Sequence, residues 1–170
     1  MTLSVSSAFD GGNISLVAID GDRIDLEIVK DHQSDFYQWF YFRLAGGAGR
    51  ALQLRLTNCA GAAYPDGWPG YQACVSQDRE DWTRAETAYA DGVLTISLTP
   101  ASDSVWIAYF APYTMERHHD LVASVVAAGV EYRSLGQTLD GREIDYFRLP
   151  GGKLQVWLYA RQHPGETMAE

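Results

Sequence analysis

The sequence is poor in lysine, in cysteine and in positive charge. Only 2 of its 170 residues are lysine and 2 are cysteine, and 13 basic residues stand against 22 acidic ones, for a formal net charge of −9. Proteins that bind nucleic acid or anionic lipid carry clustered basic side chains, whereas here the basic residues are scattered along the chain. We therefore expect no nucleic-acid partner and no membrane partner.

A long apolar run is also missing. The longest, Leu121–Gly129, contains Ser124 and is far shorter than the roughly 20 residues of a membrane-spanning helix. The first ten residues hold neither a basic residue nor an apolar block, so they do not resemble a signal peptide. Without a secretion signal, Cys59 and Cys74 are predicted to be reduced and buried, with a disulfide between them left open.

Aromatic residues and short alternating segments are abundant instead. Aromatic residues make up 12% of the sequence and favour strands. In Ala51–Thr57, strict alternation puts Leu52, Leu54 and Leu56 on one face. Turn residues separate the predicted strands, which are Ile14–Ile19, Arg23–Val29, Tyr37–Leu44, Ala51–Thr57, Gln72–Ser76, Thr83–Ala85, Thr87–Ala90, Val93–Leu98 and Ser104–Phe110. The pattern is mainly β and predicts an antiparallel β-sandwich over residues 1–111.

The pattern changes at Pro112. The next segment has no turn residue until Gly129, and a helix is expected with Thr114 as N-cap. The residues that recur at helical spacing in it are Met115, His118, His119, Val122, Val125 and Val126. Further strands are predicted at Glu131–Leu135, Glu143–Leu149 and Leu154–Tyr159. A helix followed by such strands is typical of the opening of an α/β domain, so residues 112–170 are predicted to be the beginning of an incomplete second domain with exposed apolar strand surface.

The last segment carries the most specific chemistry. His163 and Glu166 follow the predicted strand Leu154–Tyr159, and Pro164-Gly165 between them favours a tight bend. Neutral imidazole and carboxylate are suitable zinc ligands, and ligands of α/β sheets gather at the carboxyl ends of strands. The alternative is a turn that starts a helix, with Glu166 favourable near the helix N-terminus. The spacing by itself leaves both interpretations open.

Longer strings of residues carry a resemblance to a known family. Residues 159–170, YARQHPGETMAE, resemble the zinc-site opening of the M14 metallocarboxypeptidases in their cytosolic carboxypeptidase branch. Residues 134–145 resemble the first strands of that branch's catalytic domain, and residues 111–118 resemble its junction helix. The branch's N-terminal β-sandwich domain is matched by Phe9–Ile14, Trp39–Phe42, Asn58, Tyr64, Trp82–Arg84 and Tyr109. The resemblance covers essentially the whole chain.

The resemblance implies that His163 and Glu166 are the first two ligands of a catalytic zinc. It also implies that the third ligand, the general base and the substrate-binding arginines lie downstream of Glu170, so no catalytic residue is expected within this chain. The complete protein would be a cytoplasmic zinc metallocarboxypeptidase acting on peptide or protein C-termini, and this part alone would be inactive.

Two other hypotheses stay open beside that one. The first is a non-catalytic β-sandwich module that binds peptide, protein or carbohydrate, and the second is a pseudo-enzyme or regulatory truncation. Substrate specificity and oligomeric state are not predicted.

Other residues receive structural interpretations. His118 and His119 point apart on a helix, which favours packing or capping over metal binding, and Arg117 is expected in a surface or interdomain ion pair. The aromatic loop Asn58–Tyr71 is interpreted as a self-packed cover of the sandwich edge, with substrate or partner binding as the alternative. Trp39–Phe42 is expected to pack in the core. Ser97 and Ser134 lack the context of a nucleophile.

Overall fold

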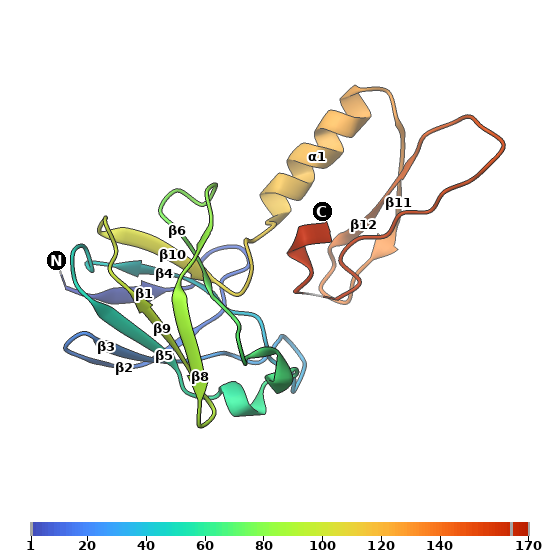
Figure 1. Ribbon diagram of the computed structural model, residues 1–170. Coiled ribbons are helices and arrows are strands. Elements are labelled where there is room, and N and C mark those ends of the chain that lie inside the picture. The colour runs from blue at the N-terminus through green and yellow to red at the C-terminus, as the bar shows by residue number, and fades with distance from the viewer. Residues whose placement is uncertain (1, 164, 170) are drawn as a thin grey trace. The chain divides into compact units, whose positions relative to one another are not determined.

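The computed structural model describes residues 2–163 and 165–169, and the chain forms two compact units (Figure 1). The first comprises Met1–Pro112 with Arg161–Glu170, and the second Tyr113–Ala160. The strands of the first unit are β1 (Ser4–Ser6), β2 (Ser15–Asp20), β3 (Arg23–Glu27), β4 (Tyr41–Ala45), β5 (Leu52–Leu56), β6 (Cys74–Ser76), β7 (Thr83–Arg84), β8 (Glu86–Ala90), β9 (Val93–Leu98) and β10 (Ser104–Ala108). It also contains three short 3₁₀ turns, η1 (Cys59–Gly61), η2 (Pro65–Gly67) and η3 (Thr167–Ala169).

These strands form two five-stranded sheets, with strand orders β1-β4-β10-β6-β7 and β2-β3-β5-β9-β8. Their apolar faces meet in one core, to which the second sheet contributes Leu54, Leu94 and Ile96, and the first Phe42 and Ile107. The alternation of β5 is reproduced, since Leu52, Leu54 and Leu56 are buried while Gln53 is exposed. The predicted mainly β sandwich is therefore confirmed.

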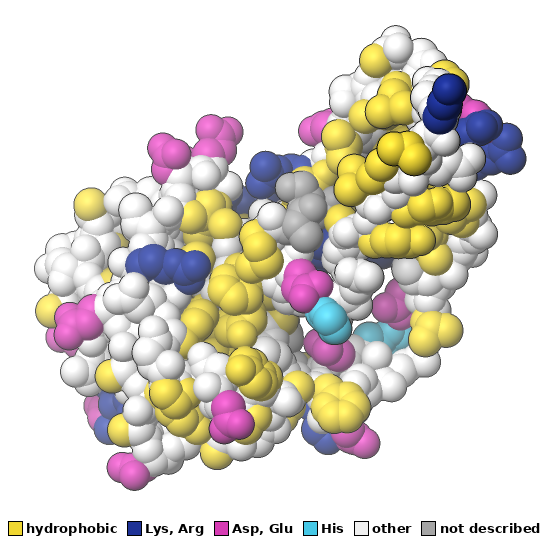
Figure 2. Space-filling view, turned by 45° about the vertical axis from the view of Figure 1, so that its right-hand side comes forward, with side chains coloured by type: hydrophobic (Ala, Val, Ile, Leu, Met, Phe, Trp, Pro, Cys, Tyr) yellow, Lys and Arg dark blue, Asp and Glu magenta, His cyan; other side chains and the backbone are white. Residues whose placement is uncertain are grey.

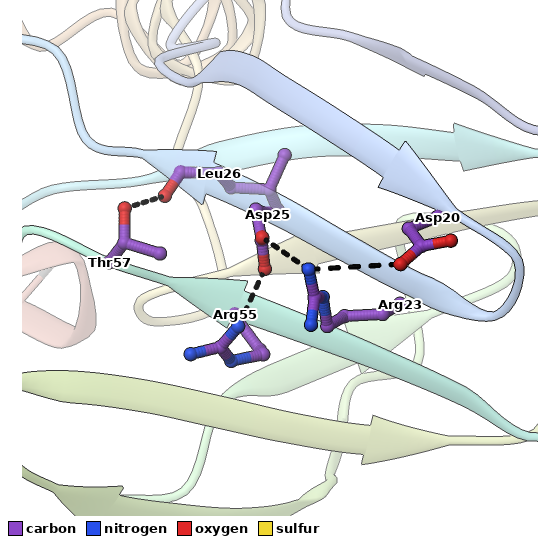
Figure 3. Close-up of polar contacts among 6 residues, drawn as sticks. All are labelled: Asp20, Arg23, Asp25, Leu26, Arg55 and Thr57. Atoms are coloured by element: carbon purple, nitrogen blue, oxygen red, sulfur yellow. Dashed lines mark hydrogen bonds and ion pairs between the residues drawn. The ribbon is translucent and has the colours of Figure 1, made fainter.

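One strand pairing departs from the antiparallel pattern. β3 and β5 run parallel, with Asp25 opposite Arg55, whereas the other strand pairs of the described residues are antiparallel. Figure 3 shows the polar side chains on these strands, where Asp25 lies 3.1 Å from Arg55 Nη1 and 3.5 Å from Arg23 Nη2. Asp25 is thus paired with an arginine on each side, and Thr57 Oγ1 donates to the Leu26 carbonyl farther along.

The predicted strand Tyr37–Leu44 is wrong in its first half, because β4 begins only at Tyr41. Before Tyr41, the Phe40 carbonyl accepts from Tyr109 N–H, whereas Tyr37 and Gln38 bond to the aromatic loop instead of to a neighbouring strand. Ala63 N–H donates to the Tyr37 carbonyl, and the Gln38 amide accepts from Tyr64 N–H at 2.9 Å. The almost wholly apolar sequence of this segment does not distinguish an extended segment that pairs with a loop from one that pairs with a strand.

The second unit contains the helix α1 (Met115–Ala127) and the antiparallel hairpin β11 (Glu131–Gln137) and β12 (Glu143–Arg148). Half-buried residues of α1 recur at Met115, His118, Val122 and Val125, as the spacing predicts, whereas His119 and Val126 are exposed. Thr114 occupies the N-cap position without a side-chain capping bond, and Gly129 beyond the helix has a φ of 81°.

The strand predicted at Leu154–Tyr159 is absent: these residues lie in no strand and are exposed. Leu154, Val156 and Leu158 are 81–92% exposed, and Trp157 and Tyr159 are 63% and 70% exposed. A strand needs a neighbour for its backbone hydrogen bonds, and the described residues provide none here. The exposed apolar surface that the sequence predicts for this unit is present.

Two surface properties bear on partners. No helix among the described residues is both long and apolar enough to cross a membrane. On the face drawn in Figure 2 the lysine and arginine side chains form small groups separated by uncharged surface, in line with their scatter along the sequence.

Candidate metal-ligand site

His163 and Glu166 are brought together by a tight turn. Glu166 N–H donates to the His163 carbonyl at 3.1 Å, and η3 begins at the next residue, Thr167. Gly165 lies inside the turn, while Pro164, to which the sequence also assigned the bend, lies outside the described residues. The three-residue spacing therefore puts both side chains on the same side of the chain.

The two side chains contact each other directly. His163 Nδ1 lies 2.8 Å from Glu166 Oε1, and His163 N–H donates to Oε2 at 3.3 Å. The hydrogen bond from His163 holds the pKa of Glu166 below its usual value, so the carboxylate is ionised at neutral pH. An ionised carboxylate only accepts hydrogen bonds, which makes the ring nitrogen the donor. Both side chains are open to solvent, with exposures of 79% for His163 and 43% for Glu166.

This donor set fits half of a catalytic zinc site. Imidazole nitrogen and carboxylate oxygen are both zinc donors, and a catalytic zinc has three protein ligands with one open position. Within residues 2–163 and 165–169, no three His, Cys, Asp or Glu side chains are grouped closely enough to hold a metal. The described chain therefore offers two adjacent ligands, and their binding of zinc stays a prediction.

A second polar cluster lies in the other unit. His118 Nε2 donates to Asp145 Oδ2 at 2.6 Å, and the Tyr132 hydroxyl donates to Asp145 Oδ1 at 2.8 Å. The Asp145 side chain is only 8% exposed. This geometry makes His118 a packing residue, as its place on the helix indicated. Arg117 stacks over the Tyr113 ring, with Cζ 5.3 Å from the centroid.

The aromatic loop Asn58–Tyr71 packs against itself and the sandwich. Trp68 is fully buried and its Nε1 donates to the Cys59 carbonyl at 3.0 Å. Asn58 bonds to both backbone groups of Ile28, through Oδ1 at 3.0 Å and Nδ2 at 2.9 Å. Among its rings, Tyr64 is the exposed one, at 61%. These contacts support the interpretation of a covering loop.

The two cysteines are free and buried, which confirms the prediction of reduced thiols. Burial raises the pKa of Cys59 to about 12 and also raises that of Cys74. A thiol with a raised pKa is a poor nucleophile, so neither is a candidate for covalent catalysis.

Sequence reasoning missed Asp145 and Tyr132. The alternation of β12 could have put Asp145 on the face of Phe147, and an acid on an apolar face signals a buried partner. No local pattern identifies His118 as that partner, because 27 residues separate the two.

Comparison with known proteins identifies the relatives of this chain. A family model described as the cytosolic carboxypeptidase N-terminal domain matches residues 5–110. An uncharacterized protein of Zymomonas mobilis is 57% identical over 100% of this chain and 45% of its own length.

Solved structures agree with that family. A metallo-carboxypeptidase from Burkholderia cenocepacia is 42% identical with a TM-score of 0.93, over 99% of this chain and 47% of the other. A Pseudomonas aeruginosa metallo-carboxypeptidase, in complex with (2-guanidinoethylmercapto)succinic acid, is 38% identical with a TM-score of 0.86, over 97% of this chain and 46% of the other.

The chain thus spans about half the length of these relatives. Over that half the identity is high, the fold is shared, and the family model covers nearly all of the sandwich. The chain therefore belongs to the family of cytosolic carboxypeptidase N-terminal domains.

Proposed function

We propose that this chain is the N-terminal part of a zinc-dependent metallocarboxypeptidase that removes C-terminal residues from peptides or proteins in the cytoplasm. The observation that carries the proposal is the pairing of His163 with Glu166, 2.8 Å apart, in a chain 42% identical to a metallo-carboxypeptidase. We place the division between the sandwich domain and the start of the catalytic domain at residues 111 and 112.

In this proposal His163 and Glu166 hold the metal. The lowered pKa of Glu166, caused by its hydrogen bond with His163, keeps the carboxylate charged for a cation near neutral pH. Bound zinc would supply an activated water and polarise the scissile carbonyl. The third ligand and the residues that move protons would come from outside residues 1–170, so the chain by itself is proposed to be inactive.

The substrate proposal rests on the family and on one complex. A carboxypeptidase acts at a free terminal carboxylate, and the compound bound to the Pseudomonas aeruginosa relative is a succinic acid derivative. Peptides with a free C-terminus are therefore proposed as substrates, and the same peptides with an amidated C-terminus are the natural negative control.

Metal analysis tests the proposal. Zinc is measured after dialysis on this chain and on a longer version that spans the full length of the solved relatives. We expect about one zinc per molecule of the longer protein and little on the 170-residue chain, because two ligands make a weak site. His163→Ala and Glu166→Gln should remove zinc from the longer protein, whereas His32→Ala, at an exposed histidine of the sandwich, should not.

Two results would contradict the proposal. If the longer protein holds no zinc, the two residues are structural, and the binding-module hypothesis becomes the better one. If the 170-residue chain alone releases C-terminal residues and His163→Ala abolishes that release, the proposed inactivity is wrong.

A further inference from the structure

The His163–Glu166 turn packs with the sandwich. The segment from Arg161 onward belongs to the same compact unit as residues 1–112, although nearly fifty residues of chain separate them. Thr167, in η3, is buried to 6% exposure, whereas its neighbour Met168 is 64% exposed. One side of this segment is therefore covered and the other is open.

One contact between the turn and the sandwich is specific. A Cβ placed on Gly165 would lie 3.5 Å from Tyr109 Cε1 and 3.8 Å from Tyr109 Cδ1. These are ordinary van der Waals distances, so the backbone at Gly165 lies directly against the Tyr109 ring. Gly165 lies in the turn between the two candidate ligands, directly before Glu166.

The Tyr109 ring is held rigidly by its own neighbours. It stacks on Tyr71 with centroids 5.1 Å apart, and makes edge contacts with Trp68 at 5.6 Å and Phe40 at 5.9 Å. Its backbone is fixed as well, because its N–H donates to the Phe40 carbonyl and its carbonyl accepts from the Tyr71 hydroxyl. The Gln38 amide donates to its hydroxyl at 3.4 Å. A ring fixed in this way can serve as a firm support for a loop.

Upstream of the turn, residues 154–159 lie in no strand and are exposed. We propose that Tyr109 is a positioning residue for the metal-ligand turn: the sandwich domain supports the backbone at Gly165 and so sets the place of His163 and Glu166. The consequence for metal binding rests on the proposed function above, whereas the contact itself does not.

The contact is tested in the 170-residue chain by NMR, which reports the amide signals of Gly165 and Thr167. An aromatic ring shifts the signals of nuclei that lie against it, so Tyr109→Ala should move both signals. Tyr109→Phe keeps the ring and removes only the long bond to Gln38, so it should leave them in place. Leu94→Ala is the matched core variant, because Leu94 is fully buried in β9, and it should lower sandwich stability without moving these signals.

A second pair of variants acts from the side of the turn. Gly165→Ala adds a Cβ at an ordinary contact distance and should be tolerated. Gly165→Leu is too large for the space beside the ring and should displace the turn while the urea midpoint of the sandwich stays unchanged. This pair decides the question if Tyr109→Ala fails to fold.

Zinc affinity is the readout in the longer protein. Tyr109→Ala and Gly165→Leu should weaken zinc binding about tenfold or more, the size of effect usual for residues that orient metal ligands. Tyr109→Phe, Gly165→Ala and Leu94→Ala should not weaken it. The inference is overturned if Tyr109→Ala and Gly165→Leu leave the Gly165 and Thr167 signals and the zinc affinity unchanged, or if Leu94→Ala has the same effects. If the signals move as expected but no form binds zinc, the positioning contact stands and the proposed function fails.

Discussion

His118 Nε2 lies 2.6 Å from Asp145 Oδ2, and this bond links α1 to the β11–β12 hairpin within the second unit. Asp145 accepts a second bond from the Tyr132 hydroxyl, so each of its oxygens has a partner. The helix has no fully buried residue. Its attachment to the hairpin therefore depends on a half-buried apolar stripe and on this bond.

Replacing the acid should loosen the helix. Asp145→Asn removes the negative charge and replaces one of the two accepting oxygens by an NH2 group. The attachment of the helix should therefore be weakened by about 1–3 kcal/mol. Hydrogen exchange of the α1 amides should become about tenfold faster or more. His119→Gln, at the exposed neighbouring histidine, is the control and should leave exchange unchanged. Equal exchange rates in the Asp145→Asn and native proteins would show that the bond does not hold the helix.

The pKa of Asp145 predicts that the attachment of the helix weakens at low pH, which sets an acid limit. Burial raises the pKa of Asp145, but the hydrogen bonds from His118 and Tyr132 lower it more, so it lies below its usual value of 3.8. A folded-state pKa below the unfolded one gives stability that is complete above the unfolded value and is lost as the pH falls through the folded value. The contribution of this carboxyl should therefore be constant above about pH 5 and be lost progressively as the pH falls below about 4.

An alkaline limit follows from Tyr132. Its hydrogen bond to Asp145 raises the pKa of the Tyr132 hydroxyl to about 12, so this stabilisation is complete below the unfolded value and is lost as the pH rises towards 12. Exchange of the α1 amides, corrected for intrinsic pH dependence, checks both limits. The acid limit should vanish in Asp145→Asn, and a loss of protection that persists there would assign it to another group.

Asn58 should be one of the most sensitive polar positions of the sandwich. Its side chain bonds to the N–H and the carbonyl of Ile28, which is itself 3% exposed. Asn58→Ala leaves both backbone groups unpaired and should lower the free energy of unfolding by about 1–3 kcal/mol, measured by urea denaturation. Gln53→Ala, at an exposed amide of β5, should change it by less than about 0.5 kcal/mol. If Asn58→Ala leaves the free energy of unfolding unchanged, water must replace both hydrogen bonds.

The two thiols should be unreactive in the folded protein. Cys59 and Cys74 are buried and their pKa values are raised by burial, so a thiol reagent at pH 8 should modify neither one without unfolding. After denaturation without reductant, both thiols should react. Fast labelling of the native protein would mean that the sandwich opens readily, and fewer than two reactive thiols after unfolding would mean a disulfide.

Much of the sandwich follows from local pattern because burial on one face imposes a period of two. Leu52, Leu54 and Leu56 alternate in the sequence and are buried together in β5. The failures occur where an extended segment has an unusual partner or none. Residues 37 and 38 bond to the aromatic loop, and residues 154–159 lie in no strand. Neither fact changes the local sequence pattern.

The candidate site likewise has one part that the sequence predicts and one part that it does not. The three-residue separation of His163 and Glu166 predicts that one turn can join them, and they are joined, since an i,i+3 contact needs only local backbone geometry. The support of that turn by Tyr109 could not be predicted, because it depends on packing across 56 positions of the chain.

The sequence by itself therefore determined most of the strands, the helix, the buried thiols and the tight turn at His163 and Glu166, all of which follow from periodicity, turn residues and short-range contact. Only the tertiary structure decided that β3 and β5 run parallel, that Asp145 binds His118 and that Gly165 lies against Tyr109. The physical reason is that local patterns set which face of a segment is buried, whereas the partner on that face is chosen by how distant segments pack together.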